Sequence, residues 1–170
     1  TLIVWDWKSF ERIYTLPGHT GPIAAVKAIP GTNQVVSASE DRSLQIWDID
    51  TGKWVGKLGE HLSGVNAVAI TPDGLHAVSA SHDTSLKVWD LTSGQEKHAL
   101  VGHEGDVASV IVLPNSEEIV SGSWDMQIRV WRLETGLMGM APIDSTHYRG
   151  VTALATLPKT QGFISASHDG

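Results

Sequence analysis

The sequence has no cysteine among its 170 residues. Disulfide bonds and thiolate-ligated metal sites are therefore excluded, and the absence fits a reducing compartment, so we expect a cytoplasmic protein. The sequence also lacks any run of 18 apolar residues and any basic segment followed by a short apolar one. We therefore expect no membrane-spanning helix, no secretory signal and no membrane partner.

Positive charge is scarce as well. There are 12 Lys and Arg residues against 19 Asp and Glu, which gives a formal net charge of −7. Binding to a phosphate backbone needs clustered Lys and Arg side chains, and here the basic residues are scattered. We expect no nucleic-acid partner.

Tryptophan, histidine and aspartate are present and recur at regular intervals. The tryptophans of one series are 42 residues apart and end similar apolar runs: Trp5, Trp47, Trp89 and Trp131. An aspartate series and a histidine series both have spacings of 42, 42 and 44: Asp41, Asp83, Asp125 and Asp169, and His19, His61, His103 and His147. Such spacing identifies an internal repeat. The two extra residues of the last period fall within 135–146.

Each period contains four short β-type segments separated by turn residues. In the repeat that begins at His61, the expected strands are 65–70, 75–81, 86–90 and 95–101. No segment has a sustained apolar period of 3.6 residues, which argues against helices. Four antiparallel strands per repeat predict an all-β fold in which each repeat is one blade of a β-propeller.

The order of motifs in each period resembles the WD-repeat (WD40) β-propellers. A Gly-His pair is followed by Ser-Ala-Ser-x-Asp and then by an apolar run that ends in Trp-Asp, and the resemblance covers essentially the whole chain. It implies one hydrogen-bonded tetrad of His, Ser, Asp and Trp in every blade. The matching sets are His19, Ser37, Asp41 and Trp47; His61, Ser79, Asp83 and Trp89; His103, Ser121, Asp125 and Trp131; and His147, Ser165, Asp169 and, from the opposite end of the chain, Trp5.

These tetrads are interpreted as structural, because buried indole, hydroxyl and imidazole groups can satisfy one another's hydrogen bonds. Ser, His and Asp also occur together in nucleophilic catalysis. However, four copies at one period are typical of a scaffold, so we expect no catalytic residues and no enzyme. His82 and His168, each followed by Asp, lack the close Cys, His and carboxylate grouping of a zinc site. We expect no metal and no cofactor.

The resemblance also implies a face on which other proteins or peptides dock, where the first strands begin and the turn before each third strand lies. The residues just before the turn aspartates are Glu40, His82, Trp124 and His168. The first strands add Asn66, Asp106 and Thr152. Trp124 differs from the Glu or His of its sister repeats, and it is either an interface anchor or packs against a neighbouring blade. Small, polar and acidic groups around one indole favour a peptide or loop as ligand.

The repeats divide the chain into three whole blades, at 19–60, 61–102 and 103–146. The third and fourth strands of another blade are expected in 1–18, and its first and second strands in 147–170. Three closures follow: a four-bladed ring, an eight-bladed ring made by two copies, or a piece of a longer propeller. We favour a homodimer with eight blades that acts as a non-catalytic protein-interaction scaffold. The alternative is an excised or engineered fragment that mainly self-assembles and has no independent ligand.

Overall fold

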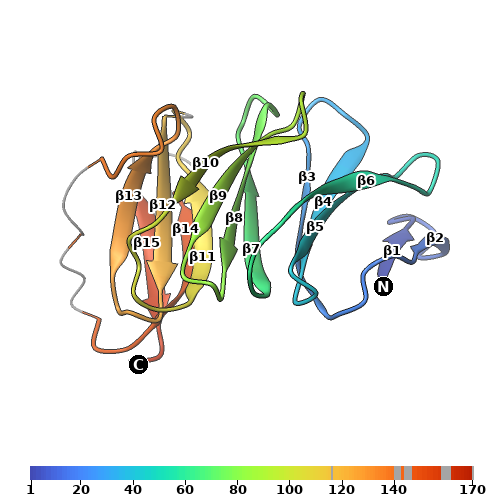
Figure 1. Cartoon of the computed structure of the whole chain (residues 1–170). Coiled ribbons are helices and arrows are strands. Elements are labelled where there is room, and N and C mark those ends of the chain that lie inside the picture. Colours follow the sequence, from blue (N-terminus) through green and yellow to red (C-terminus); the bar gives the residue numbers. More distant parts are fainter. Residues whose placement is uncertain (116, 140–142, 144–146, 158–161, 170) are drawn as a thin grey trace.

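The computed structural model describes residues 1–170 apart from 116, 140–142, 144–146, 158–161 and 170. Every regular element in this described part is a β-strand, as the all-β prediction requires. The strands stand side by side in an arc whose two chain ends lie far apart (Figure 1). Within the same residues, no helix is long and apolar enough to cross a membrane.

Two of the predicted blades are complete four-stranded antiparallel sheets. The first has the order β3-β4-β5-β6 and corresponds to the repeat 19–60; the second has the order β10-β9-β8-β7 and corresponds to 61–102. The strands of the first are β3 (Ile23–Ala28), β4 (Gln34–Ser39), β5 (Ser43–Asp48) and β6 (Lys53–Glu60). Those of the second are β7 (Val65–Ile70), β8 (His76–Ser81), β9 (Leu86–Asp90) and β10 (Gln95–Leu100).

The third blade has three described strands, in the order β11-β12-β13. They are β11 (Val107–Val112), β12 (Glu118–Ser123) and β13 (Ile128–Arg132). Where a fourth strand is expected, Met138 and Ile143 form isolated antiparallel bridges to Trp131 and Ile128. Residues 140–142 and 144–146 of the predicted 135–146 insertion lie outside the described residues.

The two ends of the chain are two-stranded half-blades. One consists of β1 (Leu2–Trp5) and β2 (Arg12–Leu16), and the other of β14 (Val151–Thr156) and β15 (Phe163–Ser167). β14 packs against β11 and β12 of the third blade. Figure 1 shows β1 and β2 at the opposite end of the arc, so the split blade is not assembled within one chain.

The first strands of successive blades line the inner side of the arc. β3 packs against β7, β7 against β11, and β11 against β14. Each of these four strands has an irregularity near its start, for example between Val65 and Ala67, where Asn66 has no partner in the ladder. Such bulges turn a side chain out of the regular alternation.

The apolar core lies between blades. Leu86 and Leu100 of the second blade pack with Ile119 and Trp131 of the third, and all four are at most 2% exposed. Equivalent clusters join the first blade to the second and the third to β14. Since each blade buries its faces only against its neighbours, the stability of the arc comes mainly from these interfaces.

A glycine at the end of one blade receives the tryptophan of the next. A Cβ atom on Gly59 would lie 2.1 Å from Cζ3 of Trp89, and one on Gly18 would lie 2.5 Å from Cη2 of Trp47. The second repeat has Gly-Glu-His where the pattern has Gly-His, yet Gly59 still takes the place against the indole. The glycine of the motif is therefore required by close approach to the neighbouring blade.

Candidate functional site

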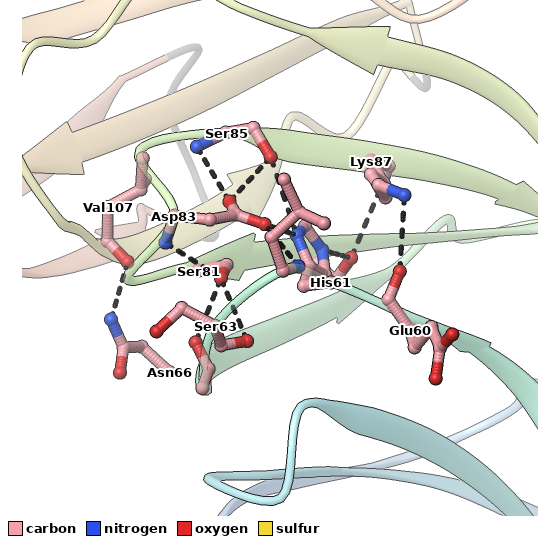
Figure 2. Close-up of polar contacts among 12 residues, drawn as sticks. Glu60, His61, Ser63, Asn66, Ser81, Asp83, Ser85, Lys87 and Val107 are labelled. Atoms are coloured by element: carbon pink, nitrogen blue, oxygen red, sulfur yellow. Dashed lines mark hydrogen bonds and ion pairs between the residues drawn. The ribbon is translucent and has the colours of Figure 1, made fainter.

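The predicted tetrad of the second blade is a continuous buried network (Figure 2 shows His61 and Asp83 with the residues around them). The indole Nε1–H of Trp89 donates to Ser79 Oγ over 2.9 Å. Ser79 Oγ lies 2.7 Å from His61 Nε2, and His61 Nδ1 lies 2.9 Å from Asp83 Oδ2. β8 supplies the serine, β9 the tryptophan, and the turn between them the aspartate.

The first and third blades repeat this geometry. The indole-to-serine distance is 2.8 Å for both Trp47 and Trp131. The serine-to-histidine distances are 2.7 and 2.8 Å, and the histidine-to-aspartate distances are 2.8 and 2.7 Å. The structure therefore brings together twelve of the sixteen predicted tetrad residues as three complete sets.

The fourth set has three members within the chain. His147 lies 2.9 Å from both Ser165 Oγ and Asp169 Oδ2. Trp5, the predicted fourth member, is on β1 at the other end of the arc and is 58% exposed. The indole donor of this set is thus not supplied by the same chain.

The tetrad aspartate accepts more hydrogen bonds than the sequence predicted. Asp83 accepts hydrogen bonds from the amides of Leu62 and Ser85 and from the hydroxyl of Ser85. Burial raises the pKa of Asp83, but these bonds and the nearby His61 outweigh it, so the pKa falls to about 2. The role of Ser85 was missed; the Asp-x-Ser spacing shared with Asp41-x-Ser43 was its only signal.

In the second and third blades, burial favours the neutral form of the tetrad histidine. Burial lowers the pKa of His61, and the attraction of Asp83 only partly offsets this effect. Burial likewise lowers the pKa of His103. A neutral imidazole facing a carboxylate at Nδ1 carries its proton there, so Ser79 donates to the bare Nε2 and accepts from Trp89.

This arrangement does not suit nucleophilic catalysis. Ser37, Ser79 and Ser121 are fully buried, and each hydroxyl is already bonded to an indole and an imidazole. A nucleophile must reach a substrate carbonyl and be free to lose its proton. In the residues that the structure describes, no group of three His, Cys, Asp or Glu side chains could hold a metal ion.

The predicted docking face is formed by four equivalent turn residues. Their amides each donate to the carbonyl oxygen of the residue third after the repeat histidine: Glu40 to Pro22, His82 to Gly64, Trp124 to Asp106, and His168 to Gly150. All four side chains are exposed. The same backbone bond therefore presents an exposed Glu, Trp or His side chain at the equivalent position of each blade.

The other predicted face residues divide into two groups. Asp106 stays at the surface, where its Oδ2 lies 2.6 Å from Nδ1 of His82 on the preceding blade. Asn66 instead donates to the carbonyl oxygen of Val107 over 3.0 Å, which ties the second blade to the third (Figure 2). Thr152 donates to Ala166 over 3.4 Å. Asn66 and Thr152 therefore bond to backbone carbonyl oxygens, whereas Asp106 pairs with the side chain of His82.

Trp124 packs against the neighbouring half-blade and is also exposed. Its ring stacks on His168 of the neighbouring half-blade with a centroid distance of 5.3 Å, and 51% of the residue stays exposed. It lines a cavity of about 430 Å³ with the residues Met126, Tyr148, Arg149, Gly150 and His168. Met126, Tyr148 and Arg149 were missed. Met126 is in the same turn as Trp124, whereas the packing of two blades brings Tyr148 and Arg149 to it.

Comparison with known protein families gives one match. The family described as WD40 (WD domain, G-beta repeat) matches residues 10–48, 52–90 and 94–132, which together make up most of the chain. A comparison with curated proteins found no match. With the three complete tetrads and the blade sheets, this match shows that the chain belongs to the WD40-repeat family.

Proposed function

We propose that this protein is a non-catalytic scaffold that binds other proteins through the face formed by Glu40, His82, Trp124 and His168. The observation that carries the proposal is a contrast between positions. The tetrads are the same in the three whole blades, whereas the turn residues of these blades, held by the same backbone bond, are Glu40, His82 and Trp124. Exposed side chains that vary on a constant frame suit recognition of a partner.

Replacement of Trp124 by alanine is expected to abolish partner capture. In a pull-down from a lysate of the organism that encodes the chain, the immobilised protein should retain a partner and the Trp124→Ala variant should lose it. The control is Trp54→Ala, because Trp54 is similarly exposed, at 56%. Trp54 is in the first blade, where it pairs with Trp47 at the end of β5 that lies away from the turn residue Glu40. Equal capture by the Trp124 variant and the parent would rule out this face.

We further propose that two copies associate head to tail and close an eight-bladed ring. The support is the unfinished fourth tetrad, whose Ser165 lacks an indole, while Trp5 is exposed at the far end. Apolar side chains on the half-blades are also exposed, among them Ile3, Ile13 and Ile164. In the proposed dimer, β1 and β2 of one copy extend the β14-β15 sheet of the other and bury these groups.

The mass in solution tests this assembly. Light scattering after size exclusion should give twice the 18.3 kDa of one chain. Trp5→Ala should shift the protein toward the monomer, since loss of a buried indole costs about 3 kcal/mol at each of the two interfaces of the ring, or roughly ten thousandfold in dissociation constant. Trp7→Ala is the control, because Trp7 lies outside the strands and is 78% exposed. A parent mass of 18.3 kDa at all concentrations would contradict the dimer but not the docking face.

A further inference from the structure

The cavity beside Trp124 is open to solvent and lies at the boundary between the third blade and the half-blade β14-β15. A Cβ atom at Gly150 would lie 2.7 Å from Cε3 of Trp124, so only glycine lets the indole lie against the start of β14. His168 stacks on the indole at an interplanar angle of 32°. The rings of Trp124 and His168 form an aromatic wall of the cavity. This wall is held by its neighbours and still faces solvent.

This boundary differs in charge from the two preceding ones. The residues equivalent to the cavity lining include Glu40 between the first and second blades, and Glu104 and Asp106 between the second and third. At the cavity, the three acidic positions are taken by Trp124, Tyr148 and Gly150. The equivalent of Gly21, Ser63 and Gly105 is Arg149. At the first boundary Arg42, the equivalent of Met126, offsets Glu40, and the second boundary has two carboxylates and no Lys or Arg at these positions. The cavity has Arg149 and no carboxylate at them, so it is the boundary with a net positive formal charge.

The guanidinium of Arg149 is available to a ligand. In the described part of the chain it makes no hydrogen bond or ion pair, and the residue is exposed. The carboxylate of Asp169, in the turn after β15, accepts instead from His147 and from the amide of Tyr148. An unpaired guanidinium beside an aromatic wall can form a charge-assisted pair with a carboxylate.

We propose that this cavity binds an acidic peptide segment in which an aromatic or large aliphatic side chain is followed, two residues later, by Asp or Glu. The proposal rests on the proposed protein-binding function and names its ligand class. In an extended peptide, residues i and i+2 point to the same side. The apolar side chain then packs against Trp124, Met126 and Tyr148, and the carboxylate pairs with Arg149.

Synthetic peptides provide the test. Fluorescein-labelled peptides with the cores Phe-Ser-Asp, Phe-Ser-Asn, Ala-Ser-Asp, Phe-Ser-Lys and Phe-Ser-phosphoserine, all in the same Gly and Ser context, are titrated with the protein by fluorescence anisotropy. The Phe-Ser-Asp peptide should bind at least tenfold more tightly than the Asn, Ala and Lys peptides. Tighter binding of the phosphoserine peptide by tenfold or more would overturn the assignment to a carboxylate.

Two variants assign the contacts. Arg149→Gln should remove the preference for Asp over Asn, and Trp124→Ala should remove the preference for Phe over Ala. Arg132→Gln changes the net charge equally at the opposite end of β13 and should leave both preferences unchanged. Equal affinities for all five peptides would overturn this inference, whereas loss of protein capture by Trp124→Ala would still support the docking face.

Discussion

Replacing Gly59 by alanine is expected to lower the free energy of unfolding by about 3 kcal/mol. Gly59 pairs with Leu44 across β5 and β6, and its missing side chain leaves the space that Trp89 of the next blade fills. An added methyl group would overlap the ring, because its carbon would lie 2.1 and 2.2 Å from two ring atoms. The indole would have to move away from Ser79, so overpacking is combined with the loss of a buried hydrogen bond.

Gly56 provides a matched control on the same strand. It pairs with Ile46, and a Cβ atom at this position would meet nothing within 4 Å. Gly56→Ala should change stability by less than about 1 kcal/mol, in either direction. Urea unfolding followed by tryptophan fluorescence compares the two variants, and equal midpoints would show that the approach of Gly59 to Trp89 is not tight in solution.

Replacing Trp131 by alanine is expected to cost about 4 kcal/mol of stability. Trp131 is 2% exposed, packs in the core between the second and third blades, and donates to Ser121. Its removal leaves a large cavity. The buried hydroxyl of Ser121 also loses the hydrogen bond that it accepts from the indole. Unfolding in urea, monitored by circular dichroism, measures the loss.

Trp124 lies seven residues earlier in the same blade and serves as the comparison. Because it is 51% exposed and stacks only on the surface, Trp124→Ala should cost about 1 kcal/mol and leave the circular dichroism spectrum unchanged. A cost for Trp124→Ala equal to that for Trp131→Ala would mean that the indole is part of the core, and the pull-down would then report on folding.

The scaffold was predictable because each of its requirements recurs in every repeat. The spacing of Trp47, Trp89 and Trp131 identifies the third strands, and the serines and aspartates at fixed offsets identify the tetrads that the hydrogen bonds now show. The repeat identifies these residues, because every blade needs the same hydrogen bond and therefore has the same residue at the same position.

The surface features could be predicted less well because each of them depends on two blades. Asn66 was expected at the docking face, yet it donates to Val107, since the bulge in β7 directs its amide toward the next blade. The cavity of Trp124 and Arg149 depends on how the half-blade packs against the third blade. The sequence spacing alone does not specify such contacts.

The contact between a glycine and the next blade's indole also links the blades energetically. A blade that unfolds removes the surface against which the following tryptophan rests, and so weakens the neighbouring tetrad as well as its own. Stability in this chain is therefore a property of adjacent pairs, as in a one-dimensional array with nearest-neighbour coupling. Under that coupling, damage at one blade spreads along the arc, and in a single chain the terminal half-blades, which have one neighbour each, are the first to open.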